Sequence, residues 1–237
     1  MSFNKANAST IANNICINND EKLLVNSFLE VCEFLSEFPT ELSWQGKKNR
    51  PTVDDDAGLK VLANSYFSGY RRSDFPANPS TIPDEMVSII METAYGYSYE
   101  ECKKIKLEHQ HSMCAENCVG NLLERYIESK LRNSNWSWCC GEFVKAIDFI
   151  GKNEKGEWIA LQIKNRNNSE NSSSSAIRDN TNIQKWFRSF AKDTKKGRPT
   201  FTNWENLPPL MQEYGLSEDE FKLFVKNYIA TEKAKKP

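Results

Sequence analysis

Three polar side chains in one predicted β-hairpin have the types and spacing for metal-assisted chemistry. Asp148 lies in the apolar run 144–150, and Gln162 and Lys164 lie two residues apart in the run 158–164. Residues two apart in a strand project from the same face of the sheet. An acid within an apolar strand is costly to bury unless it is paired or binds a metal.

These three residues could place two oxygen ligands and one ammonium group around a divalent cation. Mg²⁺ takes carboxylate and carbonyl oxygens as ligands and keeps several waters. A lysine beside such a site can help water attack a phosphodiester. The alternative is a buried ion pair between Asp148 and Lys164 in a sheet that has no catalytic function.

The elements that must position these residues are predicted strands and one long helix. The segment 151–157, between the two apolar runs, is polar and holds two glycines, as a hairpin turn requires. Residues 135–143 are predicted to form an earlier strand. Before them, Ser98 and Glu101 have the spacing of a capping box. The helix that begins with this capping box is predicted to reach about Leu131, and a break near residues 111–112 is compatible with the sequence.

The second half of this helix offers an acid to the predicted site. Apolar residues form one stripe through Ile127, and Glu116 lies three turns from Ile127 and within roughly 20° of it around the axis. Glu116 is therefore expected inside the stripe, and Glu124 at its margin. The alternative is that Glu116 stays hydrated near the start of a helix, where a negative charge is favourable.

The rest of the chain is predicted to be mainly helical at its two ends. Residues 1–18 are polar and are expected to form a loose arm. Helices are predicted at 20–38, 57–70 and 84–95, and a last helix follows Ser217. We expect a helical N-terminal region over 1–100 and a core with C-terminal helices over 101–237, the two possibly forming one continuous domain.

Two segments after the hairpin have the composition of a nucleic-acid surface. Residues 165–175 consist of four Asn, five Ser, one Arg and one Glu, side chains that contact base edges and phosphates. Residues 178–198 carry seven basic and two acidic side chains interleaved with aromatics. The middle of this segment is predicted to form a helix with an apolar inner face and a phosphate-facing outer one. The alternatives are a flexible linker and a solvated surface helix.

Whole-chain composition excludes several classes of protein. The 237 residues have a net charge of −1, so any nucleic-acid binding must come from local clustering. Seven cysteines without a Cys-x₂-Cys pair, and only two histidines, favour free thiols in a reducing cytosol over a zinc site. The N-terminus lacks the apolar run of a signal peptide, and no stretch has transmembrane length. We therefore expect a cytoplasmic protein.

A helix Glu, a strand Asp and a Gln-x-Lys on the next strand resemble the PD-(D/E)XK nuclease core. This is an α/β fold, a restriction-endonuclease-like core with a central mixed sheet flanked by helices. The resemblance covers about residues 114–190 and has two departures. Ile147 precedes Asp148 where relatives commonly have proline, and Gln162 replaces an acid, which removes a metal-binding charge.

The wider sequence is similar to type II restriction endonucleases of the SinI family, which cut DNA at GGWCC. The similar segments are 115–117, 120–127 and 162–175, and no motif that we can name covers the N-terminal half. The resemblance implies a Mg²⁺-dependent endonuclease whose products carry 5′-phosphates. A palindromic target implies a homodimer, and restriction implies a cognate DNA methyltransferase as genetic partner.

The resemblance also implies residue roles. Asp148 is the central metal ligand, Gln162 lends its amide oxygen, and Glu116, or failing it Glu124, supplies further negative charge. Lys164 orients or activates the water. The candidates for contacts with bases or phosphates are Arg166, Asn168, Glu170, Asn171, Ser173, Arg178, Lys185 and Arg188.

Three substitutions follow from these roles. Asp148→Ala and Lys164→Ala should abolish cleavage in a folded protein, and Arg188→Ala should weaken DNA binding in a salt-dependent way. Three other functions are compatible with the sequence. They are a repair or structure-specific nuclease, a non-catalytic DNA-binding module in which Gln162 marks a lost site, and a helical interaction protein.

Overall fold

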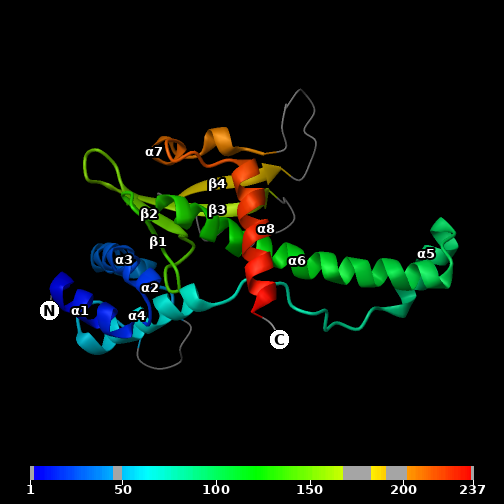
Figure 1. Cartoon of the computed structure of the whole chain (residues 1–237), viewed down its shortest axis with the longest axis horizontal. Helices are drawn as coiled ribbons and strands as arrows, with labels where there is room; N and C mark the ends of the chain where they lie inside the picture. Colours follow the sequence, from blue (N-terminus) through cyan, green and yellow to red (C-terminus); the bar gives the residue numbers. More distant parts are fainter. Residues whose placement is uncertain (1–2, 45–49, 168–182, 191–201, 236–237) are drawn as a thin grey trace.

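The computed structural model of the chain describes residues 3–44, 50–167, 183–190 and 202–235 (Figure 1). In chain order its elements are α1 (Lys5–Ile15), α2 (Asn19–Lys22), α3 (Val25–Glu37), η1 (Pro39–Glu41), α4 (Asp56–Arg71), α5 (Glu85–Tyr95), α6 (Tyr99–Leu131), β1 (Trp136–Trp138), β2 (Phe149–Lys152), β3 (Trp158–Asn167), β4 (Ile183–Phe190), η3 (Trp204–Asn206), α7 (Pro209–Gln212) and α8 (Glu218–Ala234).

The strands form one mixed sheet in the order β1-β2-β3-β4. β1 and β3 both run antiparallel to β2, and β4 runs parallel to β3. The predicted hairpin between 144–150 and 158–164 is confirmed, but β2 begins only at Phe149, directly after Asp148. The α/β class with a mixed sheet flanked by helices, which the sequence predicted, is also confirmed.

Helix α6 is the longest element and joins the sheet to a projecting end. The predicted Ser98–Glu101 capping box is present, and the helix continues without a break through residues 111–112. Its last turns, from Leu122 to Leu131, bury their apolar stripe against β1 and β3, whereas its first turns extend away from the sheet (Figure 1). Only the second half of α6 can therefore carry residues to the sheet.

An aromatic cluster fixes the end of α6 that meets the sheet. The ring of Tyr126 on α6 lies 5.8 Å from that of Trp204 and 5.4 Å from that of Phe221 on α8. Trp204 in turn lies 5.1 Å from Trp186 on β4. Burial of such rings contributes on the order of 2–3 kcal/mol each. This packing holds α6, α8 and β4 in one arrangement.

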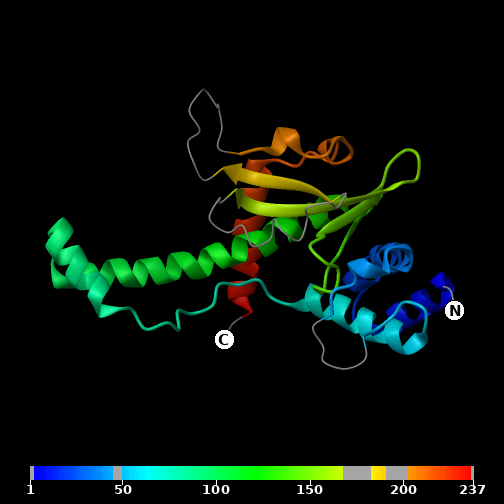
Figure 2. The same cartoon turned by 180° about the vertical axis from the view of Figure 1, so that it is seen from behind.

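The N-terminal helices pack beside β1 (Figure 2). Phe28 on α3 and Tyr66 on α4 have ring centroids 5.4 Å apart, and Phe143 lies 6.5 Å from Tyr66. The expectation of a loose arm over residues 1–18 was wrong, because residues 5–15 form α1. Ala8 and Ala12 on this helix are fully buried, and such small side chains give a weak apolar signal in a polar, Asn-rich segment.

The helix expected over residues 178–198 was also wrong where the structure describes it. Residues 183–190 form strand β4, in parallel register with β3 from Ala160 onward. Backbone pairing with β3 and the presence of Ile, Trp and Phe favour a strand there. The remainder of the segment lies outside the described residues. Across the described ranges, no helix is both long and apolar enough to cross a membrane.

Candidate active site

Asp148 is held by backbone bonds from both neighbouring strands. Its N–H donates to the carbonyl of Leu161 (2.9 Å), and its carbonyl accepts from the N–H of Cys139 (2.8 Å). Its carboxylate Oδ2 accepts from the N–H of Ile163 at 2.6 Å. Ile163 lies between Gln162 and Lys164. The carboxylate therefore lies beside the segment of β3 that carries the other two predicted residues.

A cleft of about 610 Å³ opens beside Asp148. Helices α4 and α6 and the loop 139–148 line most of it, and Ser43, Arg72, Asp74 and Trp138 complete the lining. In that loop Gly141 has φ +95°, and a Cβ there would meet the carbonyl oxygen of Ser65 at 2.7 Å. This glycine lets the loop pack directly on α4. The site is therefore not sealed within the sheet.

The structure brings Glu124, and not Glu116, to Asp148. Glu124 lines the same cleft as Asp148, and the two carboxylates repel each other. Glu116 is exposed and is not among the residues that line this cleft. Eight residues separate Glu116 from Glu124, or about 12 Å along the helix axis. Helical periodicity places Glu116 at nearly the same angle around the axis as Ile127. Glu116 nevertheless lies on a part of the helix that does not reach the sheet.

The environment of Glu124 favours its protonated form. Burial, followed by the negative charge of Asp148, raises the pKa of Glu124 from its ordinary value of 4.5 to about 8. The indole Nε1 of Trp138 donates a hydrogen bond to Glu124 Oε2 (3.0 Å), and this bond lowers the pKa of Glu124. The positive charge of Lys164 lowers it as well. Two acids that repel each other at an open cleft are suited to share a cation.

The raised pKa of Glu124 predicts a specific pH dependence of stability without divalent metal. Between its unfolded pKa near 4.5 and its folded pKa of about 8, the folded protein holds more protons. Stability from this group is complete below the lower value and is lost as pH rises through the higher one. Urea unfolding from pH 5 to 9 should therefore show wild type losing stability relative to Glu124→Gln. Glu116→Gln should behave as wild type, and parallel curves for wild type and Glu124→Gln would contradict the assignment.

Gln162 is buried and leaves one polar atom without a partner. Its side chain is 4% exposed, and within the described ranges its Oε1 accepts no hydrogen bond. A buried amide oxygen without a partner carries a substantial free-energy cost. A cation or water ligand would remove that cost.

Three further predicted residues lie on β3 and β4. Lys164 is half-buried on β3, and its positive charge acts on Glu124. Arg166, also on β3, is exposed. Lys185 is exposed on β4 in register with Gln162, and its ammonium lies 4.7 Å from the ring centroid of Phe187. Two of these cations lie on β3, which carries Gln162, and the third lies on β4, which pairs with β3.

Arg188 has a different environment from the one predicted. It lies on a strand and not on an outer helix face, and its Nη1 lies 2.7 Å from both carboxylate oxygens of Glu218 on α8. Its Nε donates to Asn165 Oδ1 at 2.9 Å. The guanidinium therefore joins β3, β4 and α8.

Replacing Arg188 with alanine should reduce stability. The ion pair is largely buried, with side chains 14% and 23% exposed, so its loss should cost about 1–3 kcal/mol of the free energy of unfolding. Urea denaturation tests this. Lys222→Ala is the control, because its pair with Asp219 is exposed and should contribute nothing measurable. Unchanged stability with salt-dependent loss of DNA binding would favour the original prediction for Arg188.

The remaining predicted DNA contacts cannot be placed. Asn168, Glu170, Asn171, Ser173 and Arg178 lie outside the described residues. Their roles stay predictions.

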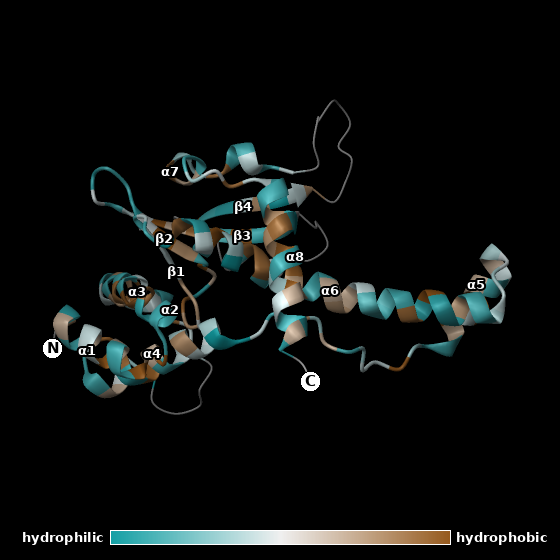
Figure 3. Ribbon diagram, viewed as in Figure 1, coloured by the Kyte–Doolittle hydropathy of each residue, from teal (hydrophilic) through white to brown (hydrophobic). Residues whose placement is uncertain are grey.

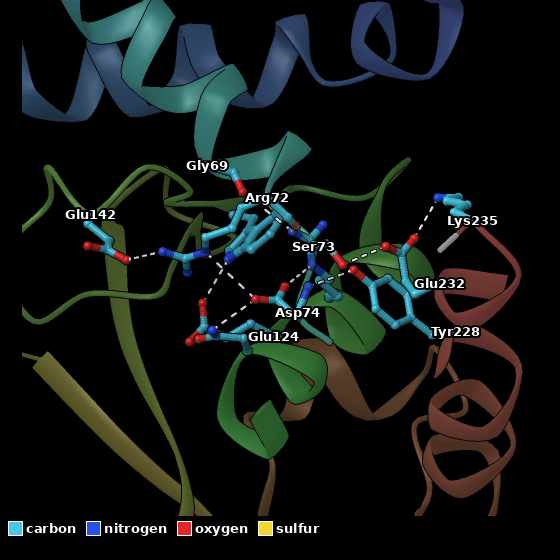
Figure 4. Close-up of polar contacts among 12 residues, drawn as sticks. Gly69, Arg72, Ser73, Asp74, Glu124, Glu142, Tyr228, Glu232 and Lys235 are labelled. Carbon is cyan, nitrogen blue, oxygen red and sulfur yellow. Dashed lines mark hydrogen bonds and ion pairs between the residues drawn. The ribbon is translucent and has the colours of Figure 1, made fainter. Parts of the chain in front are cut away.

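The structure adds a polar network that the sequence did not suggest (Figure 4). Arg72 donates to Glu142 at 2.6 Å on one side and lies 3.7 Å from Asp74 on the other. Asp74 also pairs with the buried Arg125, and Asn121 donates to it at 2.9 Å. These residues come from α6 and the segments that follow α4 and β1, so no local spacing could have predicted their association.

Among the described residues, no group of three or more His, Cys, Asp or Glu side chains is arranged to hold a metal. The proposed set differs in kind, because it has two carboxylates and one amide oxygen. Gln162 stands where the nuclease core that this chain resembles has an acid, so the set has two carboxylates where that core would have three.

Comparison with known proteins agrees with this architecture. The family model described as SinI restriction endonuclease matches residues 8–231. The chain is 45% identical over 208 residues to the type II restriction enzyme Eco47I of Escherichia coli, which covers 87% of each chain. It is 44% identical, with the same coverage, to the type II restriction enzyme SinI of Salmonella infantis. The chain therefore belongs to the SinI restriction endonuclease family and is a type II site-specific deoxyribonuclease.

Proposed function

We propose that the protein cleaves both strands of DNA at a short palindromic site, GGWCC or one similar to it, with Mg²⁺ as cofactor. The products would carry 5′-phosphates. The observation that carries this proposal is that Asp148 and Glu124 line one open cleft and lie close to the β3 segment that carries Gln162 and Lys164. The target sequence comes from the family resemblance.

The side chains at this position fit a hard divalent cation. Asp148 and Glu124 offer carboxylate oxygens that repel each other without a cation between them. The buried Oε1 of Gln162 is an oxygen donor without a hydrogen-bond partner in the described chain. Oxygen ligands of this kind suit Mg²⁺. When bound, the ion would neutralise negative charge at the phosphodiester and lower the barrier to its hydrolysis.

Each side chain then has a specific task. Asp148 is positioned by its bond from the Ile163 N–H, which fixes its carboxylate beside β3. Glu124 is oriented by the indole of Trp138 and would add the second negative charge when a bound cation favours its ionised form. The ammonium of Lys164 orients the attacking water and stabilises charge that develops on the phosphoryl oxygens.

DNA recognition is assigned to the cations of β3 and β4 and to the segment that follows β3. Arg166 and Lys185 are exposed beside the ligand-bearing strand, where they can contact phosphates. Asn168, Glu170, Asn171, Ser173 and Arg178 are proposed to contact bases or phosphates. Arg188 is proposed to support this surface through Glu218 and not to bind phosphate itself.

The biological setting follows from the same proposal. A palindrome is cut in both strands by a two-fold homodimer with one active site per strand. A cognate DNA methyltransferase would protect the host sites. All seven cysteines are free, which is consistent with a reducing compartment such as the cytoplasm.

Digestion of a sequenced plasmid with Mg²⁺ tests the proposal directly. We expect discrete fragments whose ends map to one palindromic sequence and carry 5′-phosphates. Methylation of that sequence should prevent cleavage. Random fragments, or no fragments with Mg²⁺ and intact DNA binding, would contradict it.

A matched pair of variants separates the two candidate helix acids. Glu124→Gln should reduce the cleavage rate by about 100-fold or more, because it removes one negative charge from the proposed metal site. Glu116→Gln makes the same charge change on the same helix and should leave the rate unchanged. Single-turnover cleavage of a labelled duplex measures both. The reverse result would restore Glu116 as the acid.

A further inference from the structure

Helix α5 and the first turns of α6 form an arm that projects from the body of the protein (Figures 1 and 2). We define the arm as residues 82–113. It is held mainly by α5 packing against α6 and by polar contacts to Ser88. Lys106 Nζ donates to Ser88 Oγ at 2.6 Å, and the Cys102 thiol lies 3.9 Å from its carbonyl oxygen. The arm thus has almost no core of its own.

Most of the exposed large apolar side chains are concentrated on this arm. In the described ranges ten of the fifteen such side chains belong to it, and Figure 3 shows apolar segments there, far from the sheet. They are Ile82, Met86, Val87, Ile89, Ile90, Tyr95, Tyr97, Tyr99, Leu107 and Met113. Only Ser88 is buried on α5. A helix that is apolar around most of its circumference is normally covered.

The exposed area is of the size that a stable protein interface buries. These ten side chains are 41% to 95% exposed, and together they present roughly 1,000 Å² of accessible surface. A standard interface buries about 800 Å² on each partner. An exposed apolar patch of this size on a monomer marks an interaction site. The arm alone could therefore supply a complete interface.

The charges of the arm disfavour DNA as its partner and favour a second arm. Residues 82–101 contain five acidic residues and no Lys or Arg. The negative charge of this stretch repels phosphates. The following residues 102–113 contain three lysines and one Glu. A two-fold contact places the same surface on both sides, so apolar side chains meet apolar ones, and the acidic stretch can meet the partner's lysines. The arm is thus complementary to itself.

We propose that the arm of one copy binds the arm of a second copy of this chain, forming a bundle of two helical pairs that holds the dimer together. This inference rests on the proposed homodimer and names the surface that forms it. Its test does not require cleavage, so failure of the interface and failure of the nuclease proposal are distinguishable.

Size-exclusion chromatography with light scattering of the full chain tests the interface. Wild type should have about twice the 27.3 kDa mass of one chain, and Ile90→Asp should have the mass of one chain. Ile90 is 60% exposed, so aspartate is tolerated in a folded monomer. Leu223→Asp is the matched control, because Leu223 is 53% exposed on α8, and it should stay dimeric. A monomeric wild type, or a dimeric Ile90→Asp variant, would overturn the proposal.

Hydrogen exchange gives a second measurement that needs no variant. Amides of residues 85–113 should exchange more slowly at high protein concentration than after dilution, because the interface opens on dissociation. Amides of α3 should show no such dependence. Protection of the arm that appears only when a DNA duplex is added would also overturn the proposal.

Discussion

Replacing Asp148 with asparagine should abolish DNA cleavage. Asparagine has nearly the same shape, so the bond from the Ile163 N–H and the fold should persist. The negative charge that we propose holds the cation is lost, and we expect the rate to fall by about 1,000-fold or more. Single-turnover cleavage with Mg²⁺ measures this loss.

The control for Asp148→Asn separates catalysis from binding. Asp219→Asn makes the same change at a side chain that is 94% exposed, and it should cleave at the wild-type rate. Fluorescence anisotropy should show that Asp148→Asn still binds the duplex. Cleavage by Asp148→Asn at the wild-type rate would remove the proposed site.

Replacing Lys164 with methionine should produce the second large loss. Methionine keeps most of the side-chain length of this half-buried residue but removes the ammonium, whose charge acts on Glu124 and which we propose acts on the reacting phosphate. The expected loss of rate is about 100- to 1,000-fold, the size found when a group that stabilises developing charge is removed. Cleavage under single-turnover conditions again measures it.

Two further variants define what Lys164 contributes. Lys155→Met in the exposed hairpin turn is the matched control and should cleave normally. Lys164→Arg keeps the charge but changes its shape to a planar fork, so it should recover little activity. Full activity in Lys164→Met would leave Lys164 with only a structural role.

The parts of the fold that the sequence predicted well are those with strong local signals. The capping box at Ser98, the polar turn after Lys152 and the apolar strands on either side of it all agree with the structure. These features depend on residues close in the chain. Asp148 was placed correctly beside β3 because a hairpin turn determines which residues lie opposite each other.

The wrong predictions concern features of the structure that tertiary contacts determine. Residues 183–190 contain residues suited to a strand or to an amphipathic helix, and pairing with β3 selects the strand. Glu116 was preferred over Glu124 because helical periodicity gives the direction of a side chain but not where the helix leaves the sheet. The contact between Trp138 and Glu124 joins residues 14 apart, on a helix and a strand, and has no sequence pattern.

The family comparison and the structure support each other on different points. The relatives are named as type II restriction enzymes, which decides against the repair nuclease, the binding module and the helical interaction protein. The structure shows in addition that the acid partner of Asp148 comes from the second half of α6. The substitution at Gln162 leaves a buried oxygen available, so it does not by itself mark a lost site.

Helix α6 runs for 33 residues without interruption, a length of about 50 Å. A single stiff rod thus carries Glu124 near one end and the exposed arm at the other. If two arms join two copies, the separation and relative rotation of the two catalytic centres depend on the length and curvature of this rod. The offset between the cuts in the two strands would then be altered by adding or removing helical turns in α6, and loop changes would leave it unaffected.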